Sequence, residues 1–252
     1  MTPFDIERVR RRLPARQLEW FETLGSTMQE AARMAVAGCP AGTAVVAEEQ
    51  TAGQGRHGHS WHSEPHAGLY VSVVLRLSLP PESLPTLTLA LGLATAEAIS
   101  RVCDVSADLR WPNDVMIGDR KTAGILVQLV DSVAIAGIGV NVNHTGFPTE
   151  IASQSTSLRQ ATGSTQSRED LLIALLPAID SFTKMLVEAG PRPVLEMFTR
   201  HSSYARGRRV RVEQSGGIVE GVTAGLNPSG FLILRADDGS ESLILAGGVR
   251  PV

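Results

Sequence analysis

The loop at 51–65 combines glycine with charged side chains in a way that is typical of anion-binding sites. It contains Gly53-Gln54-Gly55-Arg56-His57-Gly58 and, shortly after, Trp61. Glycine lets a backbone approach a ligand closely, and the planar guanidinium of Arg56 can hold a phosphate or a carboxylate through two hydrogen bonds. The loop therefore predicts an anion site. A plain surface connector is the alternative, since most glycine-rich loops only join two elements.

A second alternative for this loop is a zinc site, because four of its residues between positions 57 and 66 are histidines. They are His57, His59, His62 and His66. Zinc sites usually depend on ligands whose spacing is fixed by rigid elements. A glycine-rich loop supplies no such frame, which disfavours zinc on these four side chains.

A second segment with candidate functional residues contains Trp111-Pro112-Asn113-Asp114 and, after a turn, Lys121. If Gly118-Asp119 is a two-residue hairpin turn, Met116 pairs with Lys121 and Asp114 with Ala123. Asp114 and Lys121 then lie on one face as diagonal neighbours, roughly 7–8 Å apart at Cα. That separation leaves room for a phosphate or a hydrated metal ion between them. The alternative is a turn-end aspartate and an ordinary surface lysine.

The scarcity of lysine favours the chemical interpretation of Lys121. Only Lys121 and Lys184 are lysines among 23 basic residues. A solvated cation in this chain is therefore nearly always arginine, so a lysine indicates a need for a compact point charge. Lys184 lies in a predicted helix with no motif around it, so chance placement of Lys121 stays an alternative.

The segment at 136–143 is a predicted strand rich in small residues. Gly137 and Gly139 would allow a flat ring to lie against the backbone, and the amide of Asn141 can both donate and accept hydrogen bonds. Close packing of a helix on the sheet is an equally good explanation for glycine in a strand.

Strand and helix patterns alternate along most of the chain and must position these segments. Predicted strands cover 17–23, 42–49, 68–77, 109–111, 115–117, 121–130 and 133–142, and predicted helices cover 26–38, 83–102 and two stretches of 167–203. Hairpin-length linkers between the later strands indicate a mixed sheet rather than a doubly wound parallel one. From Arg208 onward, short β runs separated by turns at 215–217, 227–230 and 237–240 predict a small barrel. We therefore expect an α+β fold with a catalytic domain over 1–203 and a second domain over 204–252.

Composition excludes several classes of protein. With 23 Lys and Arg against 26 Asp and Glu, the net charge is −3, which gives little general attraction for polyanions. The N-terminus has no apolar targeting segment, and the apolar stretches such as 133–140 are far shorter than a bilayer requires. Cys39 and Cys103 show no paired spacing. A soluble, cytoplasmic protein without a membrane partner is expected.

Five motifs in order resemble the biotin protein ligase family. They are Ser26-Thr27, GQGRHG (53–58), WPND (111–114), KTAGIL (121–126) and GIGVNVN (137–143), followed by the short β tail. The resemblance implies a catalytic domain like that of class II aminoacyl-tRNA synthetases and an SH3-like C-terminal β-barrel domain. It also implies an enzyme that uses ATP and Mg²⁺ to convert biotin to biotinyl-5′-AMP. The biotinyl group then passes to one lysine of a biotin carboxyl carrier protein, such as that of an acetyl-CoA carboxylase.

Residues 1–16 are too short for a DNA-binding domain, so we expect the monofunctional form with no DNA partner. A homodimer is left open.

The resemblance also implies the residues of the site. The biotin-binding residues would be Ser26, Thr27, Gln50, Gly53, Arg56, Lys121 and Gly124. The ATP- and adenylate-binding residues would be Arg56, His57, Trp61, Trp111, Asn113, Lys121 and Asn141. Catalysis would rest on Lys121, Arg56 and Asp114, with Asp114 near the phosphates and orienting the incoming lysine. Mg²⁺ would be held mainly by the ATP phosphates, and no protein ligand is assigned to it.

Some positions depart from the family pattern. Met28 stands where an asparagine is common, and His57 and His59 stand where arginine or lysine is frequent, so the anion clamp rests mainly on Arg56. The chain ends in Gly247-Gly248-Val249-Arg250 in place of an acidic Gly-Asp-Val-type ending.

Two other functions are alternatives to biotin ligation. A lipoate-protein ligase of the same superfamily would share the lysine, but the Arg56 loop and the WPND segment are biotin-type features. A non-catalytic nucleic-acid-binding protein would use Arg206, Arg208, Arg209 and Arg211. With 4% aromatic residues, the chain offers few platforms for stacking of bases.

Overall fold

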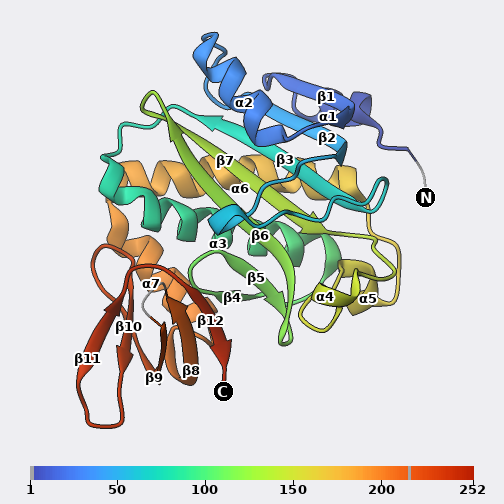
Figure 1. Ribbon diagram of the computed structural model, residues 1–252. Helices are drawn as coiled ribbons and strands as arrows, with labels where there is room; N and C mark the ends of the chain where they lie inside the picture. The colour runs from blue at the N-terminus through green and yellow to red at the C-terminus, as the bar shows by residue number, and fades with distance from the viewer. Residues whose placement is uncertain (1–2, 215–216) are drawn as a thin grey trace.

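A computed structural model describes residues 3–214 and 217–252 of the chain. The larger domain contains a seven-stranded sheet, whose strand order is β1-β2-β3-β7-β6-β5-β4 (Figure 1). The strands are β1 (Leu18–Leu24), β2 (Ala44–Gln50), β3 (Gly68–Leu75), β4 (Asp108–Arg110), β5 (Asp114–Ile117), β6 (Arg120–Val130) and β7 (Val133–Asn141). β1 and β2 run parallel and all other neighbours are antiparallel. The predicted mixed sheet is therefore confirmed, and each predicted strand is present within a few residues of its expected ends.

Helices cover both faces of this sheet. One face is packed by the apolar helix α3 (Leu84–Cys103) and by α6 (Arg168–Ala189), with α7 (Pro191–His201) beside them and α1 (Ile6–Arg12) against α6. The other face is covered by α2 (Thr27–Val36), which contacts β2, β3, β6 and β7. The predicted pair of helices in 167–203 is confirmed. Two short helices in the polar segment that follows β7, α4 (Thr149–Ala152) and α5 (Leu158–Thr162), were not predicted.

Alternation along β7 explains why a pocket forms on the α2 face. Val133 and Ile135 point toward α2 and belong to its apolar cluster, whereas Ala136, Ile138 and Val140 belong to the core on the α3 side. The next two positions on the α2 face are glycines, Gly137 and Gly139. Because side chains alternate with period two, the apolar layer under α2 stops there and leaves space above the strand.

The helix predicted over 26–38 begins at Thr27, directly after Ser26. Ser26 occupies the N-cap position with an extended backbone, but its side chain makes no capping hydrogen bond. Thr27 is the first helical residue, and its backbone N–H donates to the side chain of Gln50 instead. Ser26 thus occupies the N-cap position, but its hydroxyl does not cap the helix.

The C-terminal residues form a separate five-stranded antiparallel sheet, SH3-like, in the order β11-β10-β9-β8-β12. Its strands are β8 (Arg206–Gln214), β9 (Gly217–Leu226), β10 (Leu232–Arg235), β11 (Glu241–Ile244) and β12 (Gly248–Pro251). The predicted turns at 227–230 and 237–240 lie between these strands, and the one at 215–217 falls partly outside the described residues. The small sheet docks on the larger part below α3 and α7 in Figure 1. The expected boundary at 203/204 lies between α7 and β8.

One described helical stretch, Pro81–Cys103, is long and apolar enough to cross a membrane by length and composition. It comprises α3 and the short 3-10 turn η2 (Pro81–Ser83) before it. Most of it is buried in the molecule, against α6, α7 and the sheet. Packing in the core therefore accounts for its apolar character.

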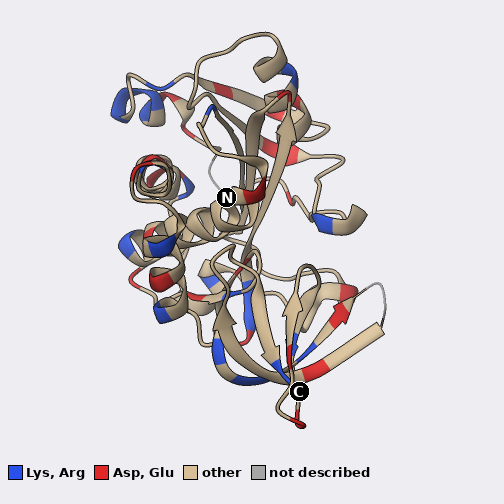
Figure 2. Cartoon of the chain, turned by 90° about the vertical axis from the view of Figure 1, so that its left-hand side faces the viewer, with Lys and Arg blue, Asp and Glu red and all other residues tan. Residues whose placement is uncertain are grey.

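Basic and acidic residues are interspersed along the helices and the C-terminal sheet (Figure 2). In β8, Arg208 pairs with Asp119 at 2.8 Å and Arg209 with Asp237 at 2.7 Å. Arg211 lies directly opposite Glu220 of β9. Acidic groups of the protein thus neutralise much of the arginine run, which weakens the case for a nucleic-acid surface.

Candidate active site

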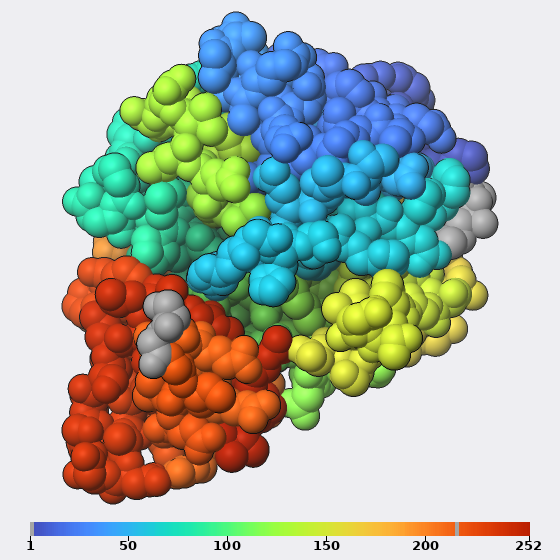
Figure 3. All heavy atoms as spheres, in the orientation of Figure 1, coloured from blue at the N-terminus to red at the C-terminus, as the bar shows by residue number. Residues whose placement is uncertain are grey.

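A pocket opens on the α2 face of the seven-stranded sheet, under the loop at 51–65. In Figure 3 this loop crosses the visible face of the molecule in cyan, above the green strands. The pocket takes residues from α2, from the end of β2, from the loop, from the residue before β5, and from β6 and β7. Its lining comprises Thr27, Met28, Gln50, Gln54, Gly55, Arg56, Trp61, Asn113, Lys121, Gly124, Ile125, Leu126, Gly137, Ile138 and Gly139.

The floor of the pocket is built from glycines that face large side chains. Gly124 of β6 and Gly139 of β7 are cross-strand partners, and the indole of Trp61 lies against both. A Cβ at Gly139 would lie 2.4 Å from Trp61 Cε2, and one at Gly124 would lie 2.8 Å from Trp61 Cζ3. The predicted flat ring against this backbone is therefore the protein's own Trp61. At Gly137, the next glycine on the face, the thioether of Met28 occupies the corresponding space.

One end of the pocket carries neutral polar groups. The backbone N–H and the hydroxyl of Thr27 both donate to Gln50 Oε1, at 2.8 and 3.0 Å, and Gln50 Nε2 donates to Ser63 Oγ. The Thr27 hydroxyl also lies 2.8 Å from Ser72 Oγ of β3. Gly53 abuts this group, since a Cβ there would lie 3.0 Å from Ser63 Oγ and 3.2 Å from Gln50 Nε2. This network orients amide and hydroxyl groups without placing a full charge at this end.

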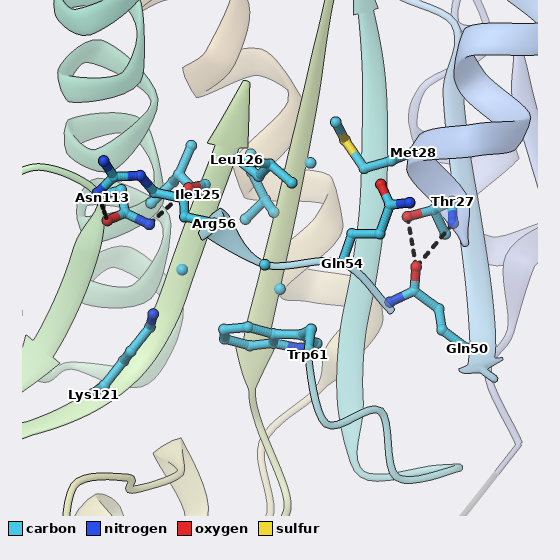
Figure 4. Close-up of a pocket in the computed structure, with 15 residues that line it drawn as sticks. Thr27, Met28, Gln50, Gln54, Arg56, Trp61, Asn113, Lys121, Ile125 and Leu126 are labelled. Carbon is cyan, nitrogen blue, oxygen red and sulfur yellow. Dashed lines mark hydrogen bonds between the residues drawn. The ribbon is translucent and has the colours of Figure 1, made fainter. Parts of the chain in front are cut away.

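The opposite end is cationic. Figure 4 shows Lys121, Arg56 and Asn113 together on one side of Trp61, with Thr27 and Gln50 on the other. Lys121 Nζ lies 5.3 Å from the centre of the Trp61 ring, which is a cation–π distance. Arg56 Nη1 donates to Asn113 Oδ1 at 3.1 Å, and Asn113 is in turn tied to both backbone groups of Ile125. Burial lowers the pKa of Arg56, while the nearby Asp114 opposes that effect.

The backbone of Lys121 is fixed on both sides. It pairs with Met116 of β5, and its N–H and C=O bond to Gln154 O and Thr156 N in the segment after α4. A charged side chain on such a held backbone loses little freedom when it binds an anion.

The relation between Asp114 and Lys121 corrects the prediction from the hairpin. The turn pairing at Ile117 and Met116 is as predicted, but the register then shifts, so that Asp114 lies opposite Gly124 instead of Ala123. Thr122 is the extra residue of this bulge. Lys121 Nζ contacts Asp114 Oδ1 directly at 2.5 Å, which leaves no room for a phosphate or a metal ion between them.

Asp114 is a carboxylate held by two cations, and its side chain is only 15% exposed. Arg110 Nη2 donates to its Oδ2 at 2.8 Å, and Lys121 contacts its other oxygen. Burial acts to raise the pKa of Asp114, but Lys121 and Arg110 outweigh burial, and the pKa is lowered from its usual value. The carboxylate is thus poorly suited to accept a proton and well placed to hold Lys121.

Two buried polar atoms beside the pocket have no partner within the described part of the chain. They are Ser26 Oγ and Trp61 Nε1. Buried donors and acceptors are nearly always satisfied in native proteins, so such atoms mark places where a ligand or water completes the bonding.

Three of the expected nucleotide residues do not line this pocket. Trp111 is buried in the core, and its Nε1 donates to Gly230 O of the C-terminal domain at 2.9 Å. Asn141 is buried and donates to Thr156 O at 3.2 Å. His57 lies on the loop with an exposed side chain. The indole N–H of Trp111 thus bonds to the C-terminal domain, and its role toward the nucleotide stays a prediction.

The structure adds residues that the motifs did not single out. Gln54 lies inside the loop motif and lines the pocket. Ser72 is fully buried beside Thr27. A signal for Ser72 was present, since it is a serine among the mainly apolar residues of β3, and it pairs opposite Gly137 of β7.

The four loop histidines do not converge on one point. Among the residues that the structure describes, His62 groups with Glu64 and His144. His66 lies near Glu48, at 3.4 Å, whereas His57 and His59 are exposed. The zinc alternative on His57, His59, His62 and His66 is therefore not supported.

Two family models match the chain. Residues 20–144 match the Biotin/lipoate A/B protein ligase family, and residues 206–249 match the Biotin protein ligase C terminal domain. The first match spans the pocket's loop and strands, and the second covers the small sheet.

Relatives match over most of their length. The chain is 32% identical over 239 residues to "Biotin--[acetyl-CoA-carboxylase] ligase" of Mycobacterium tuberculosis, covering 92% of this chain and 88% of the relative. It is 33% identical to "Bifunctional ligase/repressor BirA" of Bacillus subtilis, covering 91% and 72%. Among solved structures, the biotin protein ligase from Aquifex aeolicus in complex with biotin and ATP superposes with a TM-score of 0.83 at 31% identity, covering 94% of this chain and 99% of that one. The chain therefore belongs to the biotin protein ligase family.

Proposed function

We propose that the protein activates biotin with ATP as biotinyl-5′-AMP and transfers the biotinyl group to one lysine of the biotin carboxyl carrier protein of an acetyl-CoA carboxylase. One observation carries this proposal: a single pocket has a neutral hydrogen-bonding end at Thr27 and Gln50 and a cationic end at Lys121 and Arg56. Biotin has the same polarity, with a neutral ureido ring at one end and a carboxylate at the other. The complex of the Aquifex aeolicus relative with biotin and ATP and the name of the Mycobacterium tuberculosis relative support the ligands and the carrier.

In the first half-reaction, the biotin carboxylate attacks the α-phosphorus of ATP, and pyrophosphate leaves. Two anions must approach each other, which costs about 4 kcal/mol for each pair of unit charges at 4 Å and an effective dielectric constant near 20. Lys121 and Arg56 would offset this repulsion at the reacting end. Their charges are set in place before the reaction, so little reorganisation is needed as negative charge develops.

Mg²⁺ would enter this pocket with ATP. No carboxylate occurs among the described residues of the lining, and Asp114 behind Lys121 is already held by two cations. Phosphate oxygens would therefore hold the ion, which neutralises part of the triphosphate charge.

In the second half-reaction, the amine of the carrier lysine attacks the acyl carbon, and AMP leaves with the electron pair of the broken C–O bond. Lys121 would again stabilise the charge on the leaving phosphate. Asp114, with its lowered pKa, would act as a positioning residue that holds the Lys121 ammonium in place. This revises the expected role of Asp114 in orienting the incoming lysine.

The test is pyrophosphate release from ATP with biotin or with lipoate, followed by transfer to a purified apo carrier domain. We expect release with biotin, and incorporation of label into the carrier. A matched carrier whose acceptor lysine is replaced by arginine should remain unlabelled. Release with lipoate alone would support the rival ligase. Release with biotin but no transfer to the carrier would disprove the proposed protein substrate.

A further inference from the structure

We propose that the protein binds a transition-metal ion, best suited to Zn²⁺, through His62, Glu64 and His144, a site separate from the ligand pocket. None of these residues lines the pocket or takes part in the proposed reaction. His62 and Glu64 belong to the loop that covers the pocket, and His144 follows β7. The proposal does not depend on the proposed function.

The three side chains are already close to coordinating geometry. One ligand atom of each lies within 4.8 Å of the other two, and His62 Nε2 is 4.0 Å from Glu64 Oε2. Ligands about 2.1 Å from a tetrahedral ion lie roughly 3.4 Å from one another. The side chains of His62 and Glu64 are 38% and 37% exposed, so they can close this remaining gap without disturbing the core.

The hydrogen bonds of His144 leave a lone pair ready for a metal ion. The Tyr70 hydroxyl donates its one proton to Glu64 O at 3.0 Å and lies 3.3 Å from His144 Nε2. It must therefore accept from Nε2–H, which places the unprotonated nitrogen of the ring at Nδ1. That atom is buried and has no partner within the described residues.

The same hydrogen bond provides the support that metal-bound histidines generally have. A ligating imidazole usually donates its second N–H to a fixed acceptor, which sets its orientation. Tyr70 is fully buried and holds His144 in this way, while the ring of Phe147 stacks on the imidazole with the ring centres 5.2 Å apart. The buried histidine is thus a fixed ligand, and the two exposed ligands leave solvent access for the ion and for a water molecule.

The donor set selects the class of metal. Two imidazoles and one carboxylate suit Zn²⁺ and related first-row ions, whereas Mg²⁺ prefers oxygen ligands alone. A bound ion would join the loop to the segment after β7. Since Arg56 and Trp61 belong to the same loop, the ion would restrain the part of the chain that covers the pocket.

The test uses the full chain, freed of metal with a chelator and then dialysed. Zn²⁺ is titrated by calorimetry, and Co²⁺ is added to the same protein to record its visible absorption. We expect one ion per chain, with the intense bands of four-coordinate Co²⁺, and a higher melting temperature with Zn²⁺, since an ion that binds only the folded state stabilises it.

Three variants locate the site. His62→Ala and Glu64→Gln alter exposed side chains that should not affect folding, and each should weaken Zn²⁺ binding at least tenfold. His59→Ala removes an exposed histidine of the same loop outside the cluster and should leave binding unchanged. Absence of stoichiometric Zn²⁺ binding would overturn the proposal. So would equal losses in all three variants, which would indicate non-specific binding by loop histidines.

Discussion

Gly124 and Gly139 are cross-strand partners of β6 and β7, and the indole of Trp61 lies over both of them. Absence of two side chains at paired positions creates a flat surface that one aromatic ring covers. The loop is therefore fixed to the sheet at Trp61, between the cationic and the neutral ends of the pocket (Figure 4).

We expect Gly139→Ala to displace Trp61 and weaken biotin binding about tenfold, which corresponds to about 1.4 kcal/mol. The new Cβ would lie 2.4 Å from the indole, so the ring must move. Titration calorimetry with biotin measures the effect. Gly137→Ala is the matched control and should cost less, because the atoms it meets belong to the flexible Met28 side chain.

A double-mutant cycle checks the cause. If Gly139→Ala acts through Trp61, adding it to Trp61→Ala should cost little more than Trp61→Ala alone. Additive losses would mean that Gly139 acts on the ligand directly.

Replacement of Lys121 by arginine should slow both half-reactions by roughly 10²-fold or more, the range found when one preorganised charge donor is lost. The Lys121 ammonium lies in contact with Asp114, and a planar guanidinium cannot occupy that place without moving away from the pocket. Pyrophosphate release and single-turnover transfer measure the two steps. Lys184→Arg changes the other lysine, whose side chain is 70% exposed, and should leave both rates unaltered. Near-full activity of Lys121→Arg would show that the ammonium is not required.

Arg56→Gly should increase the off-rate of biotinyl-5′-AMP by about tenfold or more, as expected for loss of a hydrogen bond from a charged group. Lys121 and Mg²⁺ would still support some adenylation, so the variant should release the reactive anhydride. The measurement is the adenylate off-rate, together with biotin label on an added protein that is not a carrier. A variant that still makes adenylate, keeps the wild-type off-rate and labels no bystander would place retention elsewhere in the pocket.

His144 should make the protein less stable in mild acid. Burial lowers its pKa to about 4, below the value near 6.5 of an unfolded histidine, so the unfolded chain binds the proton first as the pH falls. The stabilising effect is complete above about pH 6.5 and is lost as the pH falls toward 4. From pH 7 to pH 5 the free energy of unfolding should decrease by about 2 kcal/mol from this group alone. Urea unfolding with a chelator present measures this decrease.

His144→Gln is the comparison for this measurement. Its side-chain amide can still donate to Tyr70 but does not titrate, so the variant should lose less stability between pH 7 and pH 5. An equal loss in both proteins would assign the acid sensitivity to other groups.

The sequence by itself determined the elements and their order. β-rich runs, with alternation at 68–77, located β1 to β7. The linkers around Gly118-Asp119 and Asp131-Ser132 were too short for parallel neighbours, and Gly190-Pro191 separated α6 from α7. These are local properties, since propensity, turn chemistry and side-chain period act between residues that are close along the chain. The order of the five motifs, which indicated the family, is likewise read directly from the sequence.

Contacts between distant segments were decided only by the tertiary structure. The bulge at Thr122 shifts one register position and converts the expected gap between Asp114 and Lys121 into a direct ion pair. Trp111 belongs to a motif, yet its ring bonds to Gly230 of the other domain. Such outcomes depend on hydrogen-bond register and on the sum of many weak packing contacts, each small on its own, so no local pattern specifies them. His62 and His144 illustrate this limit, because only the folded sheet brings the end of β7 beside the loop.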